Sequence, residues 1–188
     1  FLTYTPPASM TQTLQQQYQK TILPALQKEF GIANVMAVPR IQKVVINTGI
    51  GRMVKDSGAI ERVQRDMTVL SGQKPVIRKA KKSIASFKLR EGMPVGVSVT
   101  LRGKRMYDFL HRLIALALPL SKDFRGVDMK NVDGAGNLNL GIKEHTIFPE
   151  VTYESVKDIF SLQVTIVTNA QNRERGIALL KQIGIPFK

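Results

Sequence analysis

The prediction of the fold starts from the stretch Lys74–Arg105, KPVIRKAKKSIASFKLREGMPVGVSVTLRGKR. It contains ten lysines and arginines and a single acid, Glu91, so it carries +9 of charge in a chain whose net charge is +14. From Val95 to Leu101, apolar residues alternate with Gly, Ser and Thr, which is typical of a strand with one buried face. We therefore expect a basic loop attached to a strand whose other face is small and polar, an arrangement that presents cations to a phosphate backbone. A solvated run of surface charge is the alternative.

The composition fits one folded domain that binds a polyanion. With 188 residues, 43% of them apolar, the chain is long enough to bury a single core. The positive charge indicates nucleic acid or, alternatively, an anionic membrane surface as the partner. The longest apolar run, Leu113–Leu118, is too short to span a bilayer. The absence of cysteine excludes disulfides, thiolate zinc sites and thiol catalysis.

Hydrophobic periodicity predicts three strands and four helices. The strands are Ile41–Asn47, Val95–Leu101 and Leu162–Thr168, and the first is expected to be central because both of its faces are apolar. The helices are Thr11–Phe30, Ser57–Leu70, Arg105–Leu118 and Asn172–Ile183. Pro24 is expected to kink or divide the first helix, and Pro119 to end the third. The residues of the last helix expected to face inward are Ile177, Leu180 and Ile183.

The segment Ser121–Phe148 is long and weakly patterned. A loop of this length in a compact domain is typically functional or made of irregular short strands. Because the elements do not alternate as strict βαβ units, we predict a two-layer α+β domain with a mostly antiparallel sheet. Helices should cover one face of the sheet, the other face should be partly open, and an extended basic loop should project from it. Residues 11–188 are expected to form this domain, and residues 1–10 an N-terminal extension.

No pattern of residues predicts catalysis, a metal site or a cofactor. His111 and His145 are far apart in the sequence and the chain has no cysteine, so neither an HExxH-type nor a deaminase-type metal site can be built. Gly49–Gly51 is either a phosphate cradle or a tight turn; the turn is favoured because a third glycine and a following Lys-Ser/Thr are missing. The predicted strands contain no aromatic residue, which favours recognition of a folded RNA by shape and phosphates over base stacking on the sheet.

Four blocks of the sequence point to a known family. They are VMAVPRIQKVVINTGIG (35–51), SGQKPVIRKAKKSIASFKLREGMPVGVSVTLRG (71–103), DFRGV with DGAGNLNLGIKEHTIFPEV (123–127 and 133–151), and the C-terminal GIPFK. In this order and spacing they resemble the family of the fifth protein of the large ribosomal subunit, in its bacterial type. The resemblance covers nearly everything after about Tyr18.

The resemblance implies a structural protein of the ribosome without catalytic activity. Members of the family bind 5S rRNA and large-subunit rRNA in the central protuberance, beside neighbouring 5S-binding proteins. They also contact the P-site tRNA and, through an intersubunit bridge, a protein of the small-subunit head. No membrane partner and no homo-oligomer are expected.

The resemblance also implies roles for individual residues. Hydrogen bonds to 5S rRNA are expected from Asn47, Gln73 and Thr100. Contacts with the rRNA or tRNA backbone are expected from basic residues of the second block, namely Lys74, Arg78, Lys79, Lys81, Lys82, Lys88, Arg90 and Arg102. Within that block, the tip Arg78–Lys88 is expected to reach the tRNA. The bridge to the small subunit is expected at Arg125, Asp133 and Asn137.

Two other functions stay open at the level of the sequence. An RNA-modifying enzyme would use the Gly49–Gly51 turn to bind a cofactor, but the chain offers it no catalytic constellation. A membrane-surface protein would need a helix with a basic face, whereas the charge lies on a loop and a strand. The missing initial methionine and the additional N-terminal residues favour an organellar ribosome, in a plastid or mitochondrion, over the bacterial cytoplasm.

Overall fold

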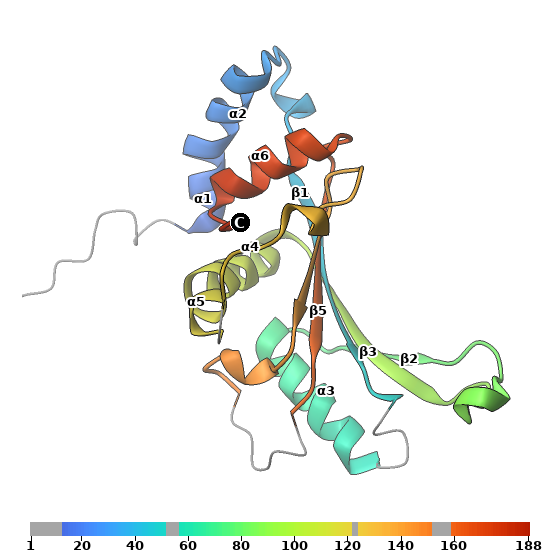
Figure 1. Ribbon diagram of the computed structural model, residues 1–188. Coiled ribbons are helices and arrows are strands. Elements are labelled where there is room, and N and C mark those ends of the chain that lie inside the picture. The colour runs from blue at the N-terminus through green and yellow to red at the C-terminus, as the bar shows by residue number, and fades with distance from the viewer. Residues whose placement is uncertain (1–12, 52–56, 122–123, 152–158) are drawn as a thin grey trace, which may run out of the picture.

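The computed structural model describes residues 13–51, 57–121, 124–151 and 159–188, and the expected extension, residues 1–10, lies outside them. One five-stranded sheet with the order β2-β3-β1-β5-β4 forms the framework, and all of its neighbouring strands pair antiparallel. The helices lie on one side of this sheet, and the hairpin that contains β2 and β3 projects to the other side (Figure 1). The predicted α+β class is therefore confirmed.

The five strands follow the hydrophobic pattern only in part. They are β1 (Ile41–Gly49), β2 (Val76–Lys79), β3 (Pro94–Leu101), β4 (Leu138–Ile142) and β5 (Leu162–Thr168). Strand β1 is central, as predicted from its apolar content. Strand β4 lies in the segment that was predicted to be a loop or irregular strands; it is short, but it alternates regularly between buried and exposed residues. Strand β2 has no buried residue, so it carries no hydrophobic signal.

The helices are close to those predicted. They are α1 (Leu14–Gln17), α2 (Leu23–Phe30), α3 (Ser57–Ser71), α4 (Gly103–Arg112), α5 (Leu118–Leu120) and α6 (Arg173–Ile183). A π-helical turn joins α1 to α2 (Tyr18–Ile22), and another joins α4 to α5 (Leu113–Ala117). In α6 the buried residues are Gly176, Leu179, Leu180 and Ile183, whereas Ile177 is half-buried. The predicted inward position of Ile177 is thus only partly correct.

The two π-helical turns explain how the chain accommodates proline inside a helix. Each turn is followed by one residue and then by a proline, Pro24 or Pro119. A proline ring has no N–H to donate and collides with the carbonyl four residues earlier. In the wider turn the N–H of Leu23 bonds to the carbonyl of Tyr18, five residues back, so the helix continues. Pro119 therefore does not end its helix as predicted; the helix extends to Leu120.

The core lies between the sheet and the helices. Buried apolar side chains alternate along the four longer strands, among them Val44 and Ile46 of β1, Val97 and Val99 of β3, and Val164 and Ile166 of β5. A shift of register between Ile41 and Lys43 brings Ile41 to the same buried layer as Val44. The rings of Phe109 (α4) and Phe148 stack with centroids 5.8 Å apart.

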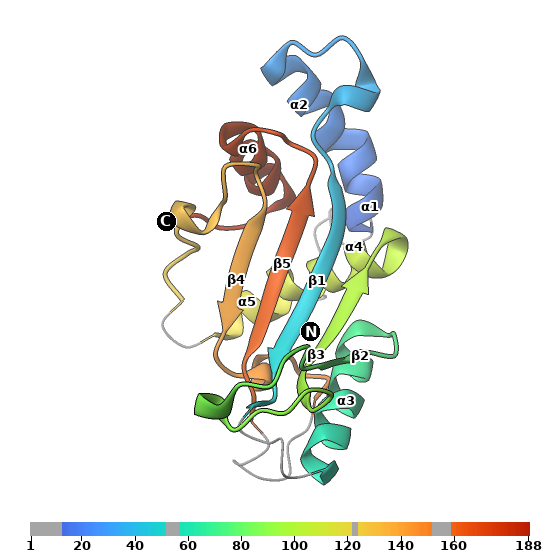
Figure 2. The same cartoon turned by 90° about the vertical axis from the view of Figure 1, so that its right-hand side faces the viewer.

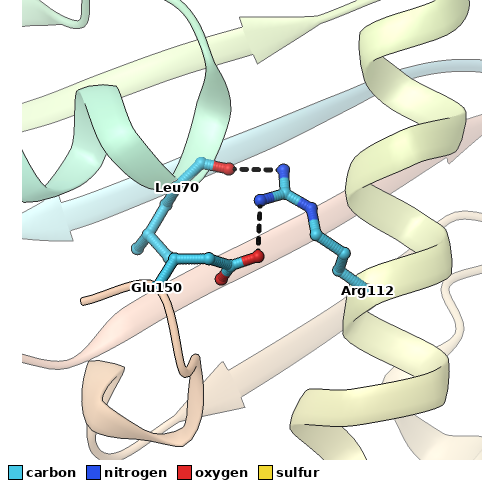
Figure 3. A network of polar contacts seen from close by, with 3 residues as sticks. All are labelled: Leu70, Arg112 and Glu150. Carbon is cyan, nitrogen blue, oxygen red and sulfur yellow. Dashed lines mark hydrogen bonds and ion pairs between the residues drawn. The ribbon is translucent and has the colours of Figure 1, made fainter.

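Arg112 joins three segments on the helical side of the molecule (Figure 3). Its guanidinium donates one hydrogen bond of 2.8 Å to the carbonyl of Leu70 and another of 2.9 Å to the carboxylate of Glu150. Leu70 lies in the last turn of α3, where carbonyls have no partner within the helix. The side chain of α4 thus completes the end of α3 and holds the loop around Glu150 against both helices.

The loop before β4 touches the start of α6 backbone to backbone. A Cβ atom built on Gly176 would lie 2.5 Å from the Cα and 2.6 Å from the carbonyl oxygen of Gly136. Gly136 itself has a φ of +85°, and a Cβ built on it would lie 2.9 Å from the Cβ of Ala170 and 3.0 Å from the carbonyl oxygen of Asn172. Only glycine at both positions permits this contact.

Substituting Gly176→Ala should therefore destabilise the protein by about 1–3 kcal/mol, because overpacking exceeds the gain of about 1 kcal/mol that alanine brings to a helix. Gly134→Ala is the matched control, since its Cβ would meet no atom within 4 Å. Urea unfolding monitored by circular dichroism measures both variants. Equal or greater stability of Gly176→Ala would show that the contact is not as close as described.

Candidate nucleic-acid interface

The face of the sheet turned away from the helices is open across its width. Figure 2 views this face, with β4, β5, β1 and β3 in front of the helices and the β2–β3 hairpin reaching toward the viewer. Two rows of side chains cross it, as the strand register shows: Ser98, Asn47, Gln163 and Gly141 in one, and Thr100, Val45, Thr165 and Asn139 in the next. The face is thus lined mainly by short, neutral, polar side chains.

The structure brings together the three residues expected to bond 5S rRNA. Asn47 lies opposite Ser98 on β3, and Thr100 lies two residues further along the same strand, so the two are diagonal neighbours on one face. Gln73, between α3 and β2, reaches the same place, where its amide lies 3.5 Å from the carbonyl oxygen of Thr100. All three side chains are half-buried. Their role in RNA binding stays a prediction, but their proximity is a property of the fold.

Other polar residues share this face and were not singled out in the sequence. Gln163 lies directly opposite Asn47, and Asn139 lies opposite Thr165. The Thr165 hydroxyl donates a 2.7 Å hydrogen bond to the side-chain oxygen of Asn139, which leaves the amide N–H groups of Asn139 as donors. The alternation of Leu138, Leu140 and Ile142 was the signal that could have placed Asn139 on this face.

Two glycines leave a hollow beside these amides. It has a volume of about 580 Å³, and Asn47, Gly49, Asn139, Gly141 and Gln163 contribute to its wall. Cβ atoms built on Gly49 and Gly141 would meet nothing within 4 Å, so the missing side chains make the hollow. A bulky ligand can therefore approach the backbone of the sheet here.

The basic residues gather on the hairpin. Lys79, Lys81, Lys82, Lys88 and Arg90 are all exposed, on or beyond the ends of β2 and β3. Arg78 differs from them, because its side chain donates a 2.8 Å hydrogen bond to the hydroxyl of Ser98 and so lies along the sheet. The hairpin thus carries a row of cations from the open face to its tip.

Two predicted contact residues lie away from the tip. Lys74 is exposed just before β2, and Arg102 is exposed at the far end of β3, where α4 begins. An RNA that touched both Arg102 and the tip would have to follow the whole length of β3, about 25 Å for eight residues.

Two of the three residues expected at the intersubunit bridge lie together. Asp133 and Asn137 close the loop before β4: the carboxylate of Asp133 accepts bonds from the N–H groups of Ala135 (3.0 Å) and Asn137 (2.7 Å) and from the Asn137 amide (2.8 Å). Asn137 in turn accepts a bond from the N–H of Thr168. Arg125 is exposed. The first two side chains therefore have a structural role, whatever they contact elsewhere.

The remaining candidates have structural explanations. The N–H of Ile50 donates to the carbonyl of Val95 at 3.1 Å, which continues the pairing of β1 with β3 past Gly49. Residues 52–56 are not described, so the turn at Gly49–Gly51 stays a prediction. His111 is exposed, as expected. His145 is fully buried, stacks on Phe160 at 3.9 Å, and accepts a hydrogen bond from its N–H.

The described part of the chain offers neither a metal site nor a membrane span. Within it, no three His, Cys, Asp or Glu side chains gather closely enough to hold an ion. None of its helices combines the length and the apolar character that crossing a bilayer requires.

Comparison with known proteins decides the family. Residues 34–90 match the model of ribosomal protein L5, and residues 94–187 match the model of the C-terminus of the same ribosomal family. The chain belongs to the ribosomal protein L5 family. The large ribosomal subunit protein uL5 of Chloroflexus aurantiacus is 51% identical over 179 residues, which cover 95% of this chain and 99% of the relative. The uL5 proteins of Synechocystis sp. (51%, 95% and 99%) and Dictyoglomus thermophilum (50%, 94% and 99%) are similar to the same extent.

Membership of the L5 family establishes a structural, non-catalytic component of the large ribosomal subunit that acts in translation. The RNA-modifying enzyme considered from the sequence is therefore ruled out. The three relatives are bacterial, so the organellar origin suggested by the sequence is unconfirmed and is not favoured.

The geometry of Asp133 predicts a pH-dependent contribution to stability. Partial burial raises its pKa, but the hydrogen bonds from Asn137, Ala135 and Gly136 outweigh burial and hold the pKa below the usual 3.8. A carboxylate whose pKa is lowered in the folded state stabilises the protein above the unfolded-state pKa, and this contribution is lost as the pH falls through the folded-state pKa.

Asp133→Asn should therefore lower the free energy of unfolding at pH 7, by less than about 1 kcal/mol because the carboxylate is exposed to solvent. The difference from wild type should shrink below about pH 4. The control Asp108→Asn removes the same charge from the exposed surface of α4. Urea unfolding at a series of pH values measures both variants. A difference that stays constant down to pH 3 would contradict the proposed role of the carboxylate.

Proposed function

We propose that this L5-family protein binds 5S rRNA on the open face of its sheet and attaches it to the large-subunit rRNA in the central protuberance. One observation carries the proposal: the uncovered polar face and the basic hairpin lie on the same side of the sheet (Figure 2). A single folded RNA can contact both. Neighbouring 5S-binding proteins complete the assembly.

The two parts of this surface contribute differently to binding. Asn47, Gln73 and Thr100 lie on or beside a rigid, hydrogen-bonded sheet and offer donors and acceptors in fixed positions. Such contacts distinguish one RNA from another. The lysines of the hairpin are exposed and neutralise phosphates of any sequence, which supplies affinity that falls with salt.

The hairpin also suits a second RNA contact. Its tip projects beyond the sheet, so it remains accessible when RNA covers the open face (Figure 1). We assign to the tip, Arg78–Lys88, the contact with the P-site tRNA. The contact with a small-subunit head protein is assigned to Arg125 and to the loop before β4 that Asp133 and Asn137 close. This loop lies at the end of the sheet opposite the hairpin (Figure 2).

Two sets of substitutions should separate specificity from charge. Replacing Lys79, Lys81 and Lys82 by Ala should weaken binding to 5S rRNA and to competitor RNA alike, and lower the salt dependence by about one unit of slope per lost phosphate contact. Replacing Asn47 or Thr100 by Ala should cost about 1–3 kcal/mol of 5S rRNA binding and little binding of other RNA. Filter binding over a series of salt concentrations gives the slope. The measurement at about 0.2 M salt with excess tRNA as competitor tests specificity, because that salt already weakens purely ionic complexes greatly.

The matched control for the lysines is the triple variant at Lys20, Lys28 and Lys181, which removes the same charge from exposed positions on the helices. It should leave the affinity for 5S rRNA nearly unchanged. Suppose that replacing the hairpin lysines abolished the preference for 5S rRNA over other RNA, and that replacing Asn47 left this preference unchanged. The open face would then not be the surface that recognises 5S rRNA.

A further inference from the structure

The tip of the basic hairpin exposes an aromatic side chain. Phe87 has 72% of its surface accessible, the largest fraction among the exposed large apolar residues of the described chain. Ile84, three residues earlier, is 43% exposed. Phe87 is not part of the buried core or of the side chains that pack against it. Folding therefore does not account for this ring.

The hairpin holds the ring in a defined place. Ile84 and Leu89 exchange two backbone hydrogen bonds of 3.0 and 3.1 Å, which close the tip. Between them Ala85–Phe87 form one 3₁₀ turn, and Lys88 follows with a φ of +52°, a conformation that residues other than glycine seldom adopt. Phe87 is thus presented by an ordered turn.

The surroundings of Phe87 are cationic. Lys81, Lys82, Lys88 and Arg90 are exposed on the same tip, and the single acid, Glu91, is the only compensating charge in Lys74–Arg105. A single exposed apolar residue is ordinary on a protein surface. An exposed aromatic ring among cations on a projecting hairpin matches the two requirements of an unstacked RNA base, a flat apolar face and neutralised flanking phosphates.

We propose that Phe87 stacks on an exposed nucleobase of an RNA loop while Lys81, Lys82 and Lys88 neutralise the neighbouring phosphates. This inference rests on the proposed function, since it assumes that the hairpin contacts RNA. It adds that the tip recognises a base that is not buried in a duplex. The aromatic stacking that the strands do not offer is thus supplied at the tip of the hairpin.

The absence of tryptophan from the chain permits a direct test. Phe87→Trp introduces a single tryptophan at the tip, whose emission can be excited apart from that of the tyrosines. Leu120→Trp, at a position that is 61% exposed on the helical side, is the matched control. Each full-length variant is titrated with tRNA, whose loops hold unpaired bases, with a fully paired RNA duplex of similar length, and with vesicles that contain phosphatidylserine.

Stacking on a base should quench the emission of Phe87→Trp with tRNA, whereas the duplex should bind through charge with much weaker quenching and Leu120→Trp should respond to neither. Equal quenching by duplex and tRNA would overturn the inference. A blue shift with vesicles, without quenching by tRNA, would overturn it in favour of membrane insertion.

Affinity measurements complete the test. Phe87→Ala and Phe87→Leu should weaken tRNA binding about tenfold with an unchanged salt dependence, because the charge is unaltered, and Phe87→Tyr should bind like wild type. If Phe87→Leu binds tRNA as wild type does, the ring is not stacked. If the wild type shows no salt-resistant preference for 5S rRNA, it is the proposed function that fails, a result independent of the Phe87 comparison.

Discussion

Strand β1 is hydrogen-bonded along both edges, to β3 and to β5, and this double pairing fixes the sides of the sheet. Its residues Val44, Ile46 and Thr48 are buried on the helical side, so Val45 and Asn47 must face the other way. The register then places Ser98 and Gln163 on either side of Asn47. The composition of the open face follows from the core on the opposite side.

When helices cover only one side of a sheet, the other side must either be polar enough to face water or be covered by a binding partner. Here the open face combines small and amide side chains with few charges, whereas the charges lie on the hairpin that extends it. Gly49, Gly96 and Gly141 have no side chains that would project from this face, so a ligand can approach the backbone there. At Gly96 a Cβ would lie 3.1 Å from the carbonyl of Thr48, so this position also depends on the close spacing of the two strands.

Much of this arrangement could be predicted, and the failures have physical causes. The alternation Val95–Leu101 correctly placed Thr100 on the polar face, and β1 was correctly predicted to be central. Strand β2 was not predicted because it is an edge strand and none of its side chains is buried. Its pairing with β3 therefore leaves no hydrophobic pattern in the sequence. The prediction that Pro119 ends its helix was wrong because a π-helical turn precedes the proline. This turn departs from the normal helical period and accommodates the proline ring within the helix.

The sequence by itself determined where the charge is concentrated, which side of β3 and of β5 is buried, and the family to which the chain belongs. The first two are local properties, because alternation and composition depend on neighbours along the chain. Only the tertiary structure decided that Gln73 lies beside Thr100, that Asn139 shares a face with Asn47, and that the side chain of Asp133 closes a loop. Periodicity gives the side on which a residue lies but not the strand that pairs beside it, and pairing depends on contacts between residues far apart in the sequence.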